Sequence, residues 1–268
     1  MVSTAVALLL PGMSLNATIF PELGLPALAP DLTAVELGED GITPELTRCR
    51  LGVYARLLDA AVSASTTWRT ARRLVVGHSF GGMLALWWLL HSGCAEAARV
   101  HGLVLVATTA GPMYDRVRAR ILRVGNRELR VGLRTLVPLW NRRLTTRTVK
   151  RLLCGGRLDA QPVDFRALAV SSDRELGVAG WRNTDWRVMR SYRHAMCGFD
   201  VRDRLGEICV PTIVLHGTKD TLFEQDDARV LARGIPGAEL RLIPGAAHAL
   251  PLTHGDELVR AVRDLLAD

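Results

Sequence analysis

The chain has 268 residues, of which 49% are hydrophobic and 23% charged, and its formal net charge is +7. This composition excludes a disordered or fibrous protein, and the length is enough for one large hydrophobic core. No apolar run approaches the roughly 20 residues that cross a bilayer, so we expect no membrane span. The first residues lack the basic start and the cleavage site of a secretory signal, which predicts a cytoplasmic protein.

The five cysteines are widely scattered and contain no CxxC pair. An odd, scattered set fits neither a disulfide framework nor a structural zinc site. We therefore expect free thiols in a reducing compartment.

Apolar runs and amphipathic stretches alternate along the first ninety residues. Residues 5–10 form a continuous apolar run that a Pro-Gly pair ends, which is typical of a strand buried on both faces. Residues 25–32 predict a second, poorer strand. Residues 44–64 carry apolar side chains at the three- and four-residue spacing of a helix. Residues 73–76 predict another strand, and the nearly all-apolar residues 83–90 predict a buried helix.

The same alternation continues later in the chain. Strands are predicted at residues 100–107, 211–217 and 238–244, and a closing helix at residues 255–266. Strands that alternate with helices across short loops favour an α/β fold with a parallel sheet. We expect about six strands, mainly parallel and flanked by helices.

A basic segment interrupts this alternation. Residues 113–205 contain 20 Arg and one Lys against nine Asp and Glu, a net charge of +12. They show no clear strand, but they have helix-like patterns at residues 117–131 and 185–197. We predict that residues 1–112 and 206–268 form the α/β core. The basic segment would then be a helical lid over the carboxyl ends of the strands, where open α/β sheets bind ligands.

The most informative motif is GHSFG at residues 77–81, which matches the pattern GxSxG. Glycines on both sides of a serine permit a sharp strand-to-helix turn that exposes the hydroxyl above the sheet. A predicted strand runs into the motif and a predicted helix runs out of it. We therefore predict that Ser79 is a nucleophile and that Gly77 and Gly81 form its turn. His78 is expected to pack beside the nucleophile rather than to act in catalysis.

A serine hydroxyl needs a base to take its proton, and that base needs a carboxylate to orient it. Asp220 and His248 directly follow the last two predicted strands, at the same end of the sheet as Ser79. The rival acids Asp226 and Asp227 lie farther from the strand end and are expected to begin a helix. The predicted catalytic group is therefore Ser79, His248 and Asp220.

This motif and the chain order Ser79, Asp220, His248 resemble the α/β-hydrolase fold superfamily, over nearly all of the chain outside the basic segment. The resemblance implies an α/β-hydrolase fold with an oxyanion hole made by the backbone amides of Phe80 and Met13.

The segment around Met13, residues 11–16, is similar to the oxyanion loop of the family, with Pro11 in place of its usual histidine. The usual first antiparallel strands of the family are absent from the sequence, so we expect a trimmed sheet.

The resemblance further implies a serine hydrolase that cleaves a carboxylic ester or thioester of a small or medium acyl group and needs no metal ion or organic cofactor. The same fold also supports elimination by a lyase, acyl transfer, cyclisation and catalytically silent ligand binding, so these alternatives stay open.

The basic segment has two interpretations of its own. Its arginines either cover solvated helix faces or attract an anionic substrate, such as an acyl group on coenzyme A or an acyl carrier protein. The sequence has no nucleic-acid binding motif, so we expect no nucleic-acid partner.

Overall fold

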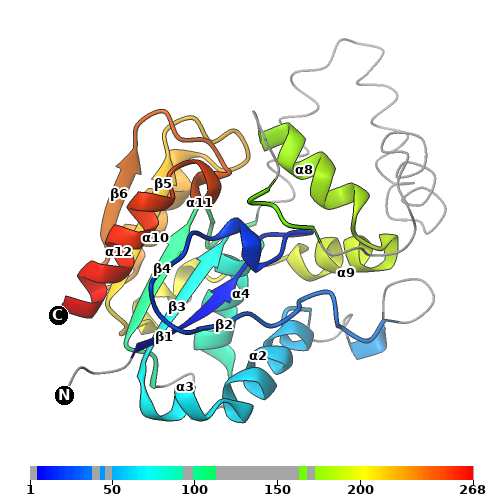
Figure 1. Cartoon of the computed structure of the whole chain (residues 1–268), viewed down its shortest axis with the longest axis horizontal. Helices are drawn as coiled ribbons and strands as arrows, with labels where there is room; N and C mark the ends of the chain where they lie inside the picture. Colours follow the sequence, from blue (N-terminus) through cyan, green and yellow to red (C-terminus); the bar gives the residue numbers. More distant parts are fainter. Residues whose placement is uncertain are drawn as a thin grey trace.

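A computed structural model describes residues 5–37, 43–45, 50–92, 99–112, 163–167 and 173–267 (Figure 1). Six parallel strands in these residues form one sheet in the order β2-β1-β3-β4-β5-β6. The strands are β1 (Ala5–Leu10), β2 (Ala27–Leu28), β3 (Arg72–His78), β4 (Gly102–Val106), β5 (Thr212–Gly217) and β6 (Glu239–Ile243). The predicted α/β fold with a mainly parallel sheet of about six strands is confirmed.

Successive side chains of each strand point to opposite faces of the sheet, and both faces are covered. In β1, Val6, Leu8 and Leu10 enter one hydrophobic cluster, whereas Ala7 and Leu9 enter the other. Burial on both faces explains why β1 reads as a continuous apolar run rather than as an alternating one.

Helices cover the two faces of the sheet (Figure 1). Those of the described residues are α2 (Gly52–Ala64), α3 (Thr66–Thr70), α4 (Phe80–His91), α8 (Asp173–Arg182), α9 (Trp186–Met196), α10 (Gln225–Gly234), α11 (Leu250–Thr253) and α12 (Gly255–Ala267), with short 3-10 helices η1 (Ala17–Ile19) and η3 (Arg202–Glu207). Side chains of α2, α4, α9 and α10 pack in the cluster that contains Leu8, and those of α11 and α12 pack in the cluster that contains Leu9.

Two elements are shorter than the sequence predicts. The strand predicted at residues 25–32 is reduced to Ala27–Leu28, because Pro26 and Pro30 on either side have no N–H to donate to a sheet. The helix predicted at residues 44–64 is helical at residues 44–45 and again, after a turn at residues 50–51, in α2, which begins at Gly52; residues 46–49 lie outside the described ranges.

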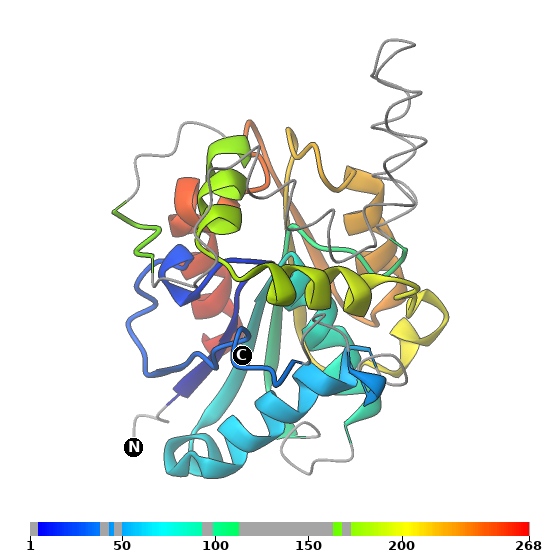
Figure 2. The same ribbon diagram turned by 90° about the vertical axis from the view of Figure 1, so that its right-hand side faces the viewer.

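The predicted lid falls only partly within the described residues. Residues 113–162 and 168–172, which include the helix predicted at 117–131, lie outside them. The described remainder contains α8 and α9, and α9 (Trp186–Met196) matches the helix predicted at residues 185–197. Both helices lie near the loops that follow the carboxyl ends of the strands (Figures 1 and 2).

Within the described part of the chain, no helix combines the length and the apolar character that crossing a bilayer requires. Two of the five cysteines, Cys197 and Cys209, are described there, and both are free and exposed.

Candidate active site

Ser79 stands at the sharp turn between β3 and α4. Its backbone has φ 54° and ψ −118°, a region that residues other than glycine rarely occupy and that costs on the order of 1–3 kcal/mol. Two contacts with the end of β4 hold this conformation. The Ser79 N–H donates to the carbonyl of Val106 at 3.0 Å, and the Thr108 hydroxyl donates to the carbonyl of Ser79 at 2.7 Å. The turn is therefore fixed by the neighbouring strand.

The two flanking glycines are required by close backbone contacts. A Cβ atom on Gly81 would lie 1.9 Å from the carbonyl oxygen of Leu10, at the end of β1. A Cβ atom on Gly77 would lie 2.7 Å from the carbonyl oxygen of Gly81. Atoms cannot approach this closely without moving the backbone. The glycines of the motif thus allow the turn to sit directly against β1.

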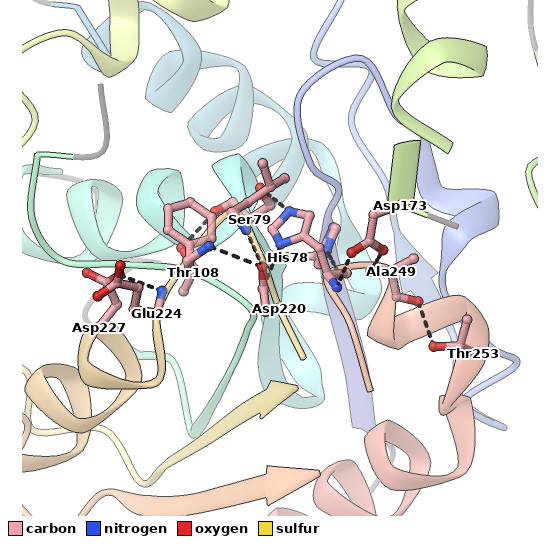
Figure 3. A network of polar contacts seen from close by, with 12 residues as sticks. His78, Ser79, Thr108, Asp173, Asp220, Glu224, Asp227, Ala249 and Thr253 are labelled. Carbon is pink, nitrogen blue, oxygen red and sulfur yellow. Dashed lines mark hydrogen bonds and ion pairs between the residues drawn. The ribbon is translucent and has the colours of Figure 1, made fainter. Parts of the chain in front are cut away.

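Ser79, His248 and Asp220 lie in one chain of hydrogen bonds. Figure 3 labels Ser79 and Asp220, the two ends of this chain. The Ser79 hydroxyl is 3.0 Å from Nε2 of His248, and Nδ1 of His248 is 2.8 Å from a carboxylate oxygen of Asp220. Ionised carboxylates only accept hydrogen bonds, so Nδ1 carries the proton and Nε2 is free to accept from the hydroxyl. The three residues predicted from the sequence are therefore brought together in the arrangement that activates a serine.

The environment of Asp220 keeps its carboxylate ionised. Its side chain is fully buried, and burial alone would raise its pKa. The hydrogen bond from His248 and the amides of Phe223 and Leu222 outweigh burial and lower the pKa of Asp220 below its usual value. A buried negative charge is thus held against His248, where it stabilises a protonated ring.

The two rival acids, Asp226 and Asp227, lie in the first turn of α10 and make their contacts there. Asp226 pairs with Arg229, and the carboxylate of Asp227 accepts from the Glu224 amide at 3.0 Å and from the Thr109 hydroxyl at 2.9 Å. Both lie in the first turn of the helix, where negative charge is favourable. The expectation that they begin a helix is confirmed.

His78, in the variable position of the motif, touches the backbone of His248. Its Nε2 atom lies 2.9 Å from the His248 carbonyl oxygen, and its side chain is completely buried. Burial, assisted by the nearby His248 ring, lowers the pKa of His78 from 6.5 to about 3. The ring is therefore neutral near pH 7, with its single proton on Nε2, and it donates to the His248 carbonyl.

This buried neutral ring predicts a specific loss of stability in mild acid. Between pH 6.5 and about 3 the unfolded chain binds a proton at His78 that the folded chain excludes. The free energy of unfolding should then fall by about 1.4 kcal/mol per pH unit below 6.5 from this residue. Urea unfolding at pH 7 and pH 5 tests this. The wild type should lose about 2 kcal/mol more than His78→Gln, which keeps an amide donor and does not titrate.

Equal losses for the wild type and His78→Gln would contradict a neutral His78.

Phe80 and Met13, the two residues expected to provide oxyanion-hole amides, lie on adjacent segments. Phe80 begins α4, and its ring is buried. The ring centroid of Phe80 lies 5.2 Å from that of Tyr54 and 4.8 Å from that of Tyr192. The loop that carries Met13 follows Leu10, whose carbonyl contacts the Ser79 turn. Neither the Met13 nor the Phe80 amide donates to another described residue. That these two amides form an oxyanion hole stays a prediction.

Sequence reasoning missed two contacts of this site. Thr108 supports the Ser79 carbonyl, and the carboxylate of Asp173 accepts from the backbone amides of His248 and Ala249. Thr108 comes just after β4, and its place at the carboxyl end of a strand could have indicated that it lies near the site. Asp173 lies in the basic segment with no motif around it.

Residues 7–261 match the alpha/beta hydrolase family. The chain belongs to this family. The alpha/beta hydrolase is 28% identical over 211 residues to a putative carbamate hydrolase of Variovorax paradoxus, covering 74% of this chain and 67% of that protein. It is 39% identical over 71 residues to a polyketide synthase of Burkholderia thailandensis, covering 26% of this chain but only 3% of that far longer protein.

The fold of this alpha/beta hydrolase is similar to that of a hydrolase from Oleispira antarctica. The TM-score is 0.66 at 16% identity, and the match covers 99% of this chain and 91% of the other. At this identity the likeness is one of fold. Family membership makes the chain an enzyme of the hydrolase type. The family does not specify the bond that is cleaved, so the reaction has to be argued from the site of this chain.

Proposed function

We propose that this alpha/beta hydrolase is a serine hydrolase that cleaves a carboxylic ester or thioester of a small or medium acyl group. The observation that carries the proposal is the hydrogen-bond chain from the Ser79 hydroxyl through His248 to Asp220, with distances of 3.0 and 2.8 Å. A hydroxyl on a strained turn, with a base and a buried carboxylate in line, is the arrangement of a nucleophile for acyl transfer.

In the proposed first half-reaction, the Ser79 oxygen attacks the acyl carbonyl carbon while His248 takes the hydroxyl proton. The amides of Met13 and Phe80 donate to the oxyanion that forms. His248 then returns the proton to the leaving alcohol or thiol, and an acyl-enzyme remains. In the second half, His248 activates water, and the acid and the free Ser79 hydroxyl are released. Asp220 stays ionised and stabilises the protonated ring throughout.

A narrower proposal concerns the carrier of the acyl group. The net charge of +12 in residues 113–205 favours an anionic carrier, such as coenzyme A or an acyl carrier protein. However, the described Arg187, Arg202 and Arg204 pair with neighbouring carboxylates, which offsets their charge locally.

If an anionic carrier is attracted, kcat/KM for a coenzyme A thioester should fall with added salt more steeply than kcat/KM for a neutral ester of the same acid.

The test of the proposed function is covalent labelling with a small fluorophosphonate, followed by intact mass measurement. We expect one adduct on the wild type and none on Ser79→Ala, because only an activated hydroxyl reacts. Ser65→Ala is the matched control, since Ser65 caps α3 away from the site and its loss should leave the adduct in place. A folded wild type without an adduct, or an adduct that survives in Ser79→Ala, would contradict the proposal.

Reactive substrates from an ester and thioester panel should then be turned over in water labelled with oxygen-18. Hydrolysis places one labelled oxygen in the released acid. A product without the label would indicate elimination, acyl transfer or cyclisation instead.

A further inference from the structure

Asp173, the first residue of α8, binds the loop that carries His248. One oxygen of its carboxylate accepts from the His248 amide at 2.7 Å, and the other accepts from the Ala249 amide at 2.8 Å (Figure 3). Asp173 precedes His248 by 75 positions in the chain and Ala249 by 76. Hydrogen bonds to an ionised acceptor are about twice as strong as neutral ones. The carboxylate therefore fixes two successive peptide groups of the loop.

His78 holds the same residue from the other side, because its Nε2–H donates to the His248 carbonyl at 2.9 Å. Both polar groups of the His248 backbone are thus bound by side chains. Among the described residues, neither group makes a hydrogen bond to another backbone group. Hence the position of the His248 ring depends on these two side chains rather than on regular secondary structure.

The other end of α8 packs on the loop that carries Met13. A Cβ atom on Gly180 would lie 2.8 Å from the carbonyl oxygen of Ser14, so the helix approaches that loop at backbone distance. One helix of the basic segment therefore contacts both the His248 loop and the loop after β1.

From these contacts we propose that Asp173 is a positioning residue for His248, which it holds in line with Ser79 by binding the His248 and Ala249 amides. The inference rests on the proposed serine-hydrolase function. Catalysis by a base depends steeply on its placement, and a displacement of about 1 Å can cost about 100-fold in rate. Asp173 acts through the backbone of His248 and touches no reacting atom itself.

The first test compares three variants on one ester substrate. Asp173→Ala should lower kcat by about 10- to 100-fold with less than about a 3-fold change in KM, because the substrate site is intact and only the base is misplaced. Asp173→Asn should fall between the wild type and Asp173→Ala, since its amide oxygen can accept from one of the two N–H groups but its NH₂ cannot accept from the other.

Asp185→Ala is the matched control. Asp185 also lies at the start of a helix of the basic segment, where it accepts from the Arg187 amide, but it does not contact His248. It should keep kcat within about 2-fold of the wild type. An equal loss of kcat in Asp185→Ala and Asp173→Ala would show that Asp173 only stabilises this segment, and the proposal would be wrong.

A second readout follows His248 directly. The Nδ1 proton between His248 and Asp220 should give a low-field proton resonance in the wild type, and this signal should shift or broaden in Asp173→Ala and Asp173→Asn but not in Asp185→Ala. An unchanged resonance with an unchanged kcat in both Asp173 variants would overturn the positioning role. If Ser79→Ala also retains turnover, the proposed function itself fails, so the two failures are distinguishable.

Discussion

Ser79→Ala should lower kcat by about 10⁶-fold on the preferred ester substrate, because the side chain that forms the acyl-enzyme is gone. His248→Ala should cost about as much, and the double variant hardly more than either single variant. The losses should not add, because the Ser79 hydroxyl lies 3.0 Å from Nε2 of His248 and each residue needs the other in order to act. Steady-state kinetics of the two single variants and the double variant test this.

The control for these measurements is His254→Ala. His254 follows His248 closely in the chain but bonds to Thr253, at the end of α11. It should keep kcat within about 2-fold of the wild type. Losses that multiply in the double variant would contradict a single nucleophile and base unit.

Asp220→Asn should lower kcat by about 10⁴-fold with little change in KM. The reason is the direction of one hydrogen bond. An asparagine amide facing Nδ1 of His248 can donate to it, which moves the ring proton to Nε2. The ring then cannot accept the proton of Ser79, although every heavy atom stays close to its place. Kinetics over a range of pH, with circular dichroism to verify the fold, would measure the loss.

Asp226→Asn is the matched control for Asp220→Asn, because Asp226 was one of the two rival acids in the sequence and binds Arg229 on α10. We expect unchanged kcat for this variant. A loss below about 10-fold for Asp220→Asn would mean that the carboxylate does not set the proton of His248.

The parts of this molecule that could be predicted from the sequence are those set by local physical constraints. The buried strand of residues 5–10 is recognisable because its whole apolar run is packed on both faces. Gly77 and Gly81 are recognisable because any side chain there would strike backbone atoms. The placement of Asp220 and His248 follows from parallel strands, whose carboxyl ends all meet at one edge of the sheet.

The contacts that could not be predicted depend on the assembled fold. Asp173 contacts His248 across 75 residues, from a helix in a segment whose sequence predicts a basic lid and gives no sign of a role for this carboxylate. The hydrogen bond from His78 to the His248 carbonyl joins the ends of β3 and β6, which are not adjacent in the sheet.

The short length of the second strand could have been predicted from the sequence, because Pro26 and Pro30 are visible there.

The Ser79 to His248 contact joins residues 169 positions apart, and His248 follows β6, one of the two edge strands of the sheet. Parallel pairing over such separations is slow, because the loop must close before the contacts form. Because the Ser79 hydroxyl needs His248 as its base, its chemical reactivity should return only when the sheet has formed from β3 to β6. Reactivity of Ser79 during refolding would therefore report completion of the sheet rather than formation of helices.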